Sequence, residues 1–331
     1  MDWIRAALPL VVCACAAAQD APRPWRIGVL LWHRSPNDLE ALDGIRAALT
    51  ASGRPHQIEV GEAMSDDTKA RSVLAGFRTA GVDLIIALGT EAALACRAAI
   101  TELPVVYTAV TNPVESGVVA GWEGSGTNLA GNSNWIPPET VLGVFRRAVP
   151  SLQRLGVLRS TTTGVVSAAE LAGMRRHLAD LPPGVPTIAL EEAVVGEVAE
   201  IDAAVGRLAE AGCEAIWIPI DFLIYENAAT VTAAAARHHL PIVSSSLRGA
   251  LSGAVAGVFV DYEMLGERAV LTILDILEGQ RAPGEIPVGT MRGYQVVVNL
   301  AAARRHGYDL PLPLIALADL VLDDELAGGG R

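Results

Sequence analysis

The chain has 331 residues, which is enough for two domains of ordinary size. Hydrophobic residues make up 51% of it and the formal net charge is −12, so it can build a large core and offers no basic stripe to nucleic acid or an anionic membrane surface. Beyond the N-terminal region the cysteines are Cys96 and Cys213. Both lie in apolar segments, so we expect buried thiols rather than a disulfide.

The N-terminus has the pattern of an export signal. Arg5 precedes a short apolar core, Ala6–Cys15, which is too short to span a bilayer, and Ala16–Ala18 give an A-x-A cleavage pattern. We therefore expect residues 1–18 to be a signal peptide and the mature protein to be periplasmic. A poor lipobox, Val12–Cys15, offers a second route in which Cys15 is lipidated. The alternative is a frayed apolar N-terminus on a cytosolic protein.

Strand-like and helix-like segments alternate through the first part of the chain. Short apolar runs predict buried strands, and amphipathic stretches predict helices. The strands are expected at 26–32, 57–60, 84–88 and 105–110, and the helices between them at 37–51, 68–80 and 91–100. This alternation indicates βαβ units, right-handed crossovers and a parallel sheet.

A stretch rich in Gly, Ser and Asn, residues 121–138, interrupts the alternation and is interpreted as a loop or a crossing between domains. The alternation then resumes. Further strands are expected at 155–158, 187–190, 215–218, 242–243, 255–260 and 295–298, and further helices at 139–148, 165–181, 197–211, 223–238, 262–278 and 300–306. The repeated pattern predicts two α/β lobes that face each other across a cleft, with a second crossing near Asp261.

The expected lobe boundaries follow from these two crossings. Residues 25–120 together with about 261–285 form the first lobe, and residues 121–260 form the second. Residues 286–331 supply a C-terminal strand and helix that the sequence assigns to neither lobe.

Seven segments, taken in order, resemble one known family along nearly the whole mature chain. They read IGVLLW at 27–32, DLIIALGTEAA at 83–93, LPVVYTAVTNPVESGVV at 103–119, NLAGNSN at 128–134, DYEMLGERA at 261–269, ILEGQRAPGEIPV at 276–288 and VVNLAAARRHGYDLP at 297–311. The chain resembles the type I periplasmic solute-binding proteins of ABC importers, specifically the tryptophan/tyrosine-type substrate-binding family. The resemblance implies an exported α/β protein with two Rossmann-like lobes, parallel sheets, a hinge, and a small ligand in the cleft.

The pocket loops depart from the pattern of that family. Residues 89–93 read GTEAA where GTPAA is usual, and residues 111–114 read TNPV where TDPV is usual. The loop after Leu158 reads RSTTTG rather than a YN-type loop, and PIDF at 219–222 lacks the polar residue that often follows the Asp. The resemblance therefore implies the fold and leaves the ligand open, with an amino acid or a small carboxylate as the expectation from the family.

Polar residues beyond the carboxyl ends of the strands are the candidate ligand contacts, because open parallel sheets bind ligands there. Thr90 and the N–H groups of the helix that follows would grip a ligand carboxylate, and Glu91 would pair a cationic group. The plainer roles are N-capping by Thr90 and a favourable charge at the helix start for Glu91. Thr111 and Asn112 would hydrogen-bond the same ligand, although Asn-Pro also initiates ordinary turns.

Three residues after the first strand are further candidates. Trp32 would cover a flat or apolar ligand, and Arg34 would form a bidentate pair with a carboxylate, with His33 between them. The alternatives are a Trp packed on its own lobe and a solvated Arg.

The second lobe contributes candidates from three strand ends. Ser160 and Thr161 would form an anion-accepting corner, the alternative being a flexible loop. Asp221 would bind an ammonium group or, alternatively, cap the helix expected at 223–238. Ser244, with the two serines after it, and Tyr262 also flank the expected cleft.

The sequence shows no catalytic or metal-binding motif. The histidines lack H-x-x-x-H and H-E-x-x-H spacings, and there is no G-x-S-x-G elbow, no P-loop and no G-x-G-x-x-G after a strand. We therefore expect no enzymatic activity, no metal and no cofactor.

The expected function is that of an extracytoplasmic solute-binding protein. Its partners would be a small-molecule ligand and an ABC permease in the membrane, with no nucleic acid, and we expect a monomeric chain. The alternative is a ligand-sensing module for a membrane sensor kinase or chemoreceptor. A third hypothesis, an enzyme with Asp221 or Glu91 as acid or base, needs a partner group at hydrogen-bond distance.

Overall fold

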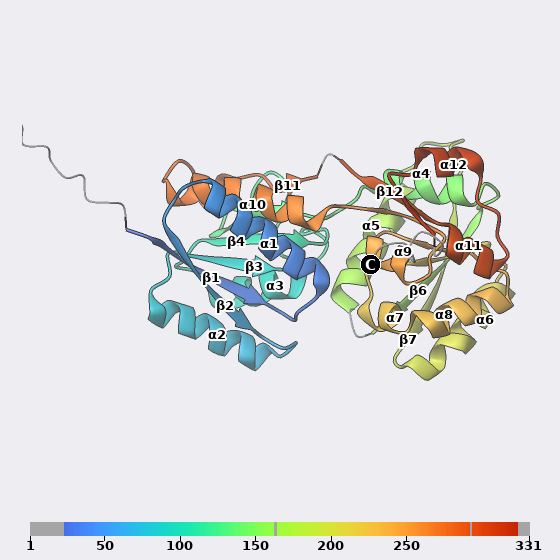
Figure 1. The fold of residues 1–331 in the computed structure, drawn as a ribbon, viewed down its shortest axis with the longest axis horizontal. Helices are drawn as coiled ribbons and strands as arrows, with labels where there is room; N and C mark the ends of the chain where they lie inside the picture. Colours follow the sequence, from blue (N-terminus) through green and yellow to red (C-terminus); the bar gives the residue numbers. More distant parts are fainter. Residues whose placement is uncertain (1–22, 162–163, 292, 324–331) are drawn as a thin grey trace, which may run out of the picture.

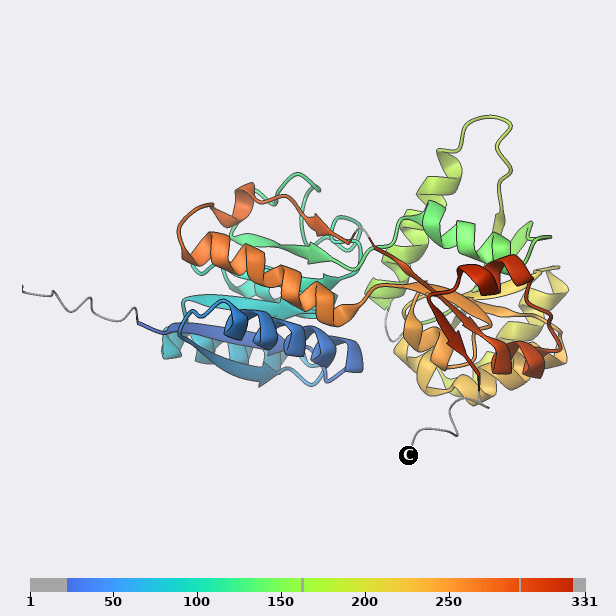
Figure 2. The same ribbon diagram turned by 45° about the horizontal axis from the view of Figure 1, so that its top comes forward.

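The computed structural model describes residues 23–161, 164–291 and 293–323. The expected signal peptide, residues 1–18, and the candidate lipidation site Cys15 lie outside the described residues. Two α/β lobes lie side by side along the longest axis of the molecule (Figure 1). Figure 2 shows the chain segments that pass from one lobe to the other.

The first lobe is built on a six-stranded parallel sheet with the order β11-β5-β4-β3-β1-β2. The strands are β1 (Trp25–Leu31), β2 (His56–Glu62), β3 (Leu84–Leu88), β4 (Val105–Val110), β5 (Leu129–Ser133) and β11 (Gly289–Thr290). Helices α1 (Pro36–Ala51) and α10 (Tyr262–Leu277) cover one face, and α2 (Asp67–Ala80) and α3 (Thr90–Ala99) cover the other. β3 and β4 are buried along their whole length, as their continuous apolar runs predict.

Two glycines allow α1 and α10 to cross closely. A Cβ atom at Gly44 would lie 2.0 Å from the carbonyl oxygen of Glu263, and one at Gly266 would lie 1.9 Å from the carbonyl oxygen of Ala41. No other residue type fits at these two positions without separating the helices. The crossing fixes the start of α10, and therefore Tyr262, against lobe 1.

The second lobe is built on a seven-stranded sheet with the order β13-β12-β10-β9-β8-β6-β7, in which only the β10–β12 pair is antiparallel among the described strands. Its strands are β6 (Arg154–Ser160), β7 (Ala189–Val195), β8 (Ala215–Ile218), β9 (Ile242–Ser244), β10 (Ala256–Phe259), β12 (Gln295–Asn299) and β13 (Leu320–Leu322). Helices α6 (Ile201–Glu210), α7 (Phe222–Glu226) and α8 (Ala228–Arg237) pack on one face. The other face carries α4 (Pro138–Ala148), α5 (Gly164–Ala179), α11 (Leu300–His306) and α12 (Leu312–Leu317), and α9 (Leu247–Leu251) follows β9.

The lobe boundaries differ from the expected ones. β5 pairs with β4, so residues up to Ser133 belong to the first sheet, whereas residues 121–260 were expected to form the second lobe. Little in the sequence indicates β5, because its five residues, LAGNS, do not form an apolar run. Gly131 is needed there, since a Cβ atom would lie 2.0 Å from the carbonyl oxygen of Tyr107. The C-terminal segment divides: β11 joins the first sheet, and β12, α11, α12 and β13 belong to the second lobe.

Two helices also differ from the expectation. The segment expected as one helix at 223–238 is divided at Asn227 into α7 and α8. The N-cap of α3 is Gly89, and Thr90 is the first helical residue instead of the cap. Cys96 and Cys213 are buried free thiols. Within the described ranges, none of the helices is long and apolar enough to cross a membrane.

Candidate functional site

A narrow space lies between the two lobes. Two adjoining cavities of about 40 and 10 Å³ share Thr111, Asn134, Ile220 and Tyr262 in their walls. Pockets for small ligands usually measure about 300–1,000 Å³. The two cavities alone are too small for a solute of ordinary size, but they adjoin a pocket of about 470 Å³ that also has walls from both lobes, including Asn37 on α1 and Arg248 on α9.

The walls come from the carboxyl ends of the strands in both lobes, where the fold places ligand sites. Lobe 1 contributes residues from β1, β3, β4 and β5 or from the segments that follow them: His33, Ser35, Asn37, Asp38, Gly89, Thr90, Glu91, Ala109, Thr111 and Asn134. Lobe 2 contributes α5 and the ends of β8, β9 and β10: Val166, Glu170, Ile220, Phe222, Ser245, Ser246, Phe259 and Val260. Trp135, Ile136 and Tyr262 lie where the chain crosses between the lobes.

Thr90 and Thr111 are joined on the lobe 1 wall. The Oγ1 atom of Thr90 accepts a hydrogen bond from the backbone N–H of Thr111 at 3.1 Å. Just before Thr111, Ala109 has a φ of +59° and the register between β4 and β5 shifts. A positive φ at a non-glycine residue is strained, and a bulge of this kind turns the end of a strand. The strain is thus located where β4 delivers Thr111 to the cavity.

Two carboxyl groups of lobe 1 line the larger cavity. Asp38 lies in the first turn of α1, where Ser35 donates its hydroxyl to Asp38 Oδ2 at 2.7 Å. Burial raises the pKa of Asp38 to about 7, although the Ser35 hydrogen bond acts against it and nearby Glu91 adds to it. Burial also raises the pKa of Glu91, which follows Thr90 on α3. Both groups favour a positively charged neighbour.

Lobe 2 places a third carboxyl group, that of Glu170, at the smaller cavity. Its Oε2 atom accepts from the backbone N–H of Ile220 at 2.6 Å, and its Oε1 atom accepts from the hydroxyl of Ser245 at 2.7 Å. Burial raises the pKa of Glu170 to about 7 in spite of these two hydrogen bonds. Glu170 thereby ties α5 to the ends of β8 and β9 at the cleft.

Tyr262 and Asn134 connect two of the crossing segments. Asn134 donates from Nδ2 to the phenolic oxygen of Tyr262 at 2.8 Å. Burial raises the pKa of Tyr262, helped by the nearby carboxyl groups of Asp38 and Glu170, so the phenol stays neutral. Tyr262 therefore stands between the acidic groups of the two lobes.

Contacts across the cleft hold the lobes together in the closed arrangement. The rings of His33 and Phe222 meet edge to face with their centroids 4.5 Å apart. Arg176 on α5 forms an ion pair with Glu115, which follows β4. A Cβ atom at Gly173 on α5 would lie 2.4 Å from the ring of Trp135, so glycine permits α5 to approach this closely.

The structure brings together at the two cavities several of the residues singled out from the sequence: His33, Thr90, Glu91, Thr111, Ser245, Ser246 and Tyr262. The other candidates do not line either cavity. Trp32 packs on the core of its own lobe, and Arg34 is exposed and pairs with Glu62 at 2.7 Å. Asn112 accepts from the backbone N–H of Glu115 at 3.2 Å through its side chain.

The remaining lobe 2 candidates also lie outside the cavity walls. Asp221 is fully buried, and its carboxylate accepts from the backbone N–H and hydroxyl of Ser160 and from the backbone N–H of Ile224. Thr161 is exposed and donates its backbone N–H to Val195. Ser244 is buried and donates its hydroxyl to the carbonyl oxygen of Ile218 at 3.2 Å.

Sequence reasoning passed over several cavity residues, chiefly Asp38, Asn134, Glu170 and Phe222. Glu170 offered a usable signal: it lies four residues after Val166 and four before Met174, both apolar, so helical spacing places an acid on a buried face. Asn134 follows β5, a strand that the sequence pattern did not predict.

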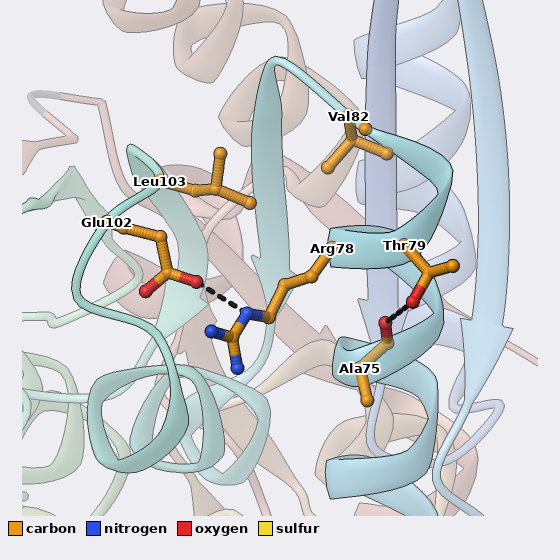
Figure 3. Close-up of a pocket in the computed structure, with 7 residues that line it drawn as sticks. Ala75, Arg78, Thr79, Val82, Glu102 and Leu103 are labelled. Carbon is orange, nitrogen blue, oxygen red and sulfur yellow. Dashed lines mark hydrogen bonds and ion pairs between the residues drawn. The ribbon is translucent and has the colours of Figure 1, made fainter.

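A larger hollow of about 530 Å³ lies elsewhere, between the end of α2 and the segment before β4 (Figure 3). Arg78 and Glu102 form an ion pair across it, and Val82 and Leu103 are also in its wall. Val82 precedes β3 and Leu103 precedes β4, so this hollow is at the amino ends of the strands. Ligand sites in open parallel sheets are at the other end, which favours the space between the lobes.

No group of three or more His, Cys, Asp or Glu residues within the described part of the chain could hold a metal ion.

The two hinged lobes with their carboxyl strand ends turned toward one cleft define the type I periplasmic-binding fold. Residues 26–322 match the family described as ABC transporter substrate binding protein, and the chain belongs to that family. It is 27% identical over 284 residues to a tyrosine-binding protein of Clostridioides difficile, covering 85% of this chain and 80% of that protein.

Solved structures share the fold. One is an ABC domain from Streptococcus pneumoniae in complex with L-Trp, 24% identical with a TM-score of 0.75, covering 91% of this chain and all of that one. Another is the ligand-free, open structure of a substrate-binding protein from Clostridium difficile, 23% identical with a TM-score of 0.72, covering 90% of this chain and 99% of that one.

Proposed function

We propose that this protein is the extracytoplasmic solute-binding component of an ABC importer and that it closes on a small organic solute between its lobes. Membership of the family supports the class of function. Relatives that bind tyrosine and L-Trp favour a solute of the size of an aromatic amino acid. The protein would act by binding and delivering its solute to a permease, without chemical change.

The observation that carries this proposal is the pair of cavities walled by strand ends from both lobes. A solute there touches both lobes only when they are closed. Its binding energy therefore shifts the equilibrium from open to closed, which is how a hinged binding protein reports that it is loaded. The apolar side chains of Val166, Ile220 and Phe222 face the same space and would receive a ring or hydrocarbon part.

The test is a thermal-shift screen of amino acids and amines on the mature protein, followed by calorimetry and small-angle scattering on the solutes that bind. A true ligand raises the midpoint of unfolding by mass action and reduces the radius of gyration. Thr111→Val should weaken binding about tenfold, the value of one net hydrogen bond. Thr79→Val, at an exposed site on α2, is the matched control and should leave affinity unchanged. If no small solute shifts the midpoint or closes the lobes, the proposal fails.

The importer role needs its own measurement. The loaded protein should stimulate the ATPase of its permease complex in proteoliposomes above the basal rate. A rate that stays basal with loaded protein would contradict delivery to a permease and would favour the sensory alternative.

A further inference from the structure

The charged lining of the two small cavities is acidic on both sides. Asp38 and Glu91 supply carboxyl groups from lobe 1, and Glu170 supplies one from lobe 2. Neither cavity has a lysine or an arginine in its wall. The imidazole of His33 is the remaining titratable nitrogen in these walls, and burial lowers its pKa, so it adds no positive charge at neutral pH.

The side-chain amide of Asn134, in the same walls, has a hydrogen-bond acceptor without a donor among the described residues. Asn134 is only 6% exposed and lines both cavities. Its Nδ2 group donates to Tyr262, whereas its Oδ1 atom has no hydrogen-bond partner within the described structure. Leaving a buried acceptor unpaired is costly, so this oxygen marks a place where a donor from outside the chain belongs.

We propose that the solute is an organic cation, an amine without a carboxylate, whose N–H groups donate to Asn134 Oδ1 and to carboxyl groups of both lobes. This inference rests on the proposed function, since it names the chemical class of the ligand for the same cleft. The unpaired amide oxygen and the three carboxyl groups are all satisfied by one kind of partner, a protonated amine.

A solute carboxylate lacks its usual bidentate partner in these two cavities, because Arg248 lies in the wall of the adjoining pocket and in neither of theirs. The hydroxyl of Ser245 is already committed as a donor to Glu170. A bound carboxylate would require the three acidic side chains in these walls to stay protonated, whereas a bound ammonium allows them to ionise.

In the absence of ligand, the three carboxyl groups can be protonated and neutral. Burial raises the pKa of Asp38, Glu91 and Glu170. The titratable groups close to Asp38 are Glu91 and Tyr262, and those close to Glu170 are Tyr225 and Tyr262. The phenols stay neutral because burial raises their pKa values too. A bound ammonium would stabilise the carboxylate forms, so uptake of the cation should release protons to the buffer.

Matched sets of ligands test the proposal on the wild-type mature protein. Tryptamine, tryptophan and indole-3-propionate share one ring system, and tyramine, tyrosine and 3-(4-hydroxyphenyl)propionate share another. We expect at least one amine to bind tenfold or more tightly than its amino acid, and the acids without an amine to give no binding. Calorimetry at pH 7 in two buffers of different ionisation enthalpy should show about one proton released for each amine bound.

Two Asp→Asn variants on the same helix locate the charge. Asp38→Asn should weaken binding of the amine about tenfold and reduce the proton release, while its oxygen still accepts from Ser35. Asp43→Asn changes an exposed carboxylate of α1, paired with Arg46, and should change neither quantity. Should Asp38→Asn fail to fold, the ligand sets on the wild-type protein decide alone.

The outcomes separate this inference from the proposed function. If tryptophan or tyrosine binds as tightly as its amine, or if amino acids bind and no amine does, the cation proposal is overturned while the binding function stands. If no amine binds and no other small solute closes the lobes, both are overturned.

Discussion

The imidazole of His33 in lobe 1 stands edge-on against the ring of Phe222 in lobe 2, with the ring centroids 4.5 Å apart and the planes at 84°. Both residues line the larger cavity, one after β1 and the other at the start of α7. The contact exists only while the lobes are closed, so its energy belongs to the closed state. It therefore contributes to solute affinity without touching the stability of either lobe alone.

Removing the ring of Phe222 tests this relationship. Aromatic pairs are worth about 0.5–1.5 kcal/mol beyond their buried area, so Phe222→Ala should weaken solute affinity by roughly threefold to tenfold or more, because the ring also walls the cavity. Scattering should show a larger mean radius of gyration at subsaturating solute. Glu210→Ala, an exposed position at the end of α6, is the control. Unchanged affinity in Phe222→Ala would mean that the ring contact does not favour closure.

A substitution at Gly173 offers a second test of lobe closure. A methyl group there would press into the ring of Trp135 at 2.4 Å and lie 3.2 Å from the side-chain nitrogen of Asn112 in lobe 1. Gly173→Ala should therefore shift the protein toward the open arrangement and weaken solute binding by about tenfold, as measured by calorimetry.

The control for Gly173 is Gly76→Ala in the middle of α2, where an added Cβ atom meets nothing within 4 Å. That variant should keep its affinity and gain roughly 0.5–1 kcal/mol of stability, because alanine loses less conformational entropy in a helix than glycine does. Equal affinities in the two variants would contradict a role for Gly173 in closure.

The fold was predictable in large part because its signals are local. β3 and β4 are continuous apolar runs, and both were expected with the bounds that the structure has. β5 was not predicted because Gly131 and Asn132 are typical of a loop, whereas Gly131 is required there by the close approach of Tyr107 in the neighbouring strand. A residue that is required by contact with a neighbouring strand does not contribute to the hydrophobic periodicity of its own segment, so the sequence pattern does not reveal it.

The site was harder to predict because a polar residue at the end of a strand can either line the cleft or form hydrogen bonds within its own lobe. Thr90 and Asp221 occupy equivalent-looking positions after β3 and β8, yet only Thr90 lines a cavity. The carboxylate of Asp221 is used up by donors of its own lobe, and this depends on Ser160, which is 61 residues away in the chain. Conversely, Glu170 reaches the cleft from a helix, outside the strand-end segments where candidates were sought.

The network around Asp221 predicts a structural phenotype. Its carboxylate accepts from Ser160 N–H at 2.6 Å, from the Ser160 hydroxyl at 2.8 Å and from Ile224 N–H at 3.2 Å, all fully buried. Hydrogen bonds to a charged group are worth about 1.5–3 kcal/mol each, so Asp221→Ala should cost on the order of 3 kcal/mol of unfolding free energy. Denaturant titration measures this loss, and affinity measured on the folded fraction should change little. A variant of normal stability that has lost its ligand would instead place Asp221 in the binding site.

Stability should also depend on pH through Asp38. Its pKa is about 7 in the folded chain against an ordinary value of 3.8, chiefly because of burial. Between these two pH values the Asp38 carboxyl group holds a proton in the folded state that it has lost in the unfolded state. Its contribution to the free energy of unfolding therefore falls as the pH rises from about 4 to about 7. Asp38→Asn removes the effect. We compare the unfolding midpoint of Asp38→Asn with that of the wild type at two pH values. The midpoint of the variant minus that of the wild type should be roughly 5 °C larger at pH 8 than at pH 5. For Asp43→Asn the same difference should not change with pH. A gap between Asp38→Asn and the wild type that stays the same at both pH values would show that the carboxyl group of Asp38 ionises without cost in the folded protein.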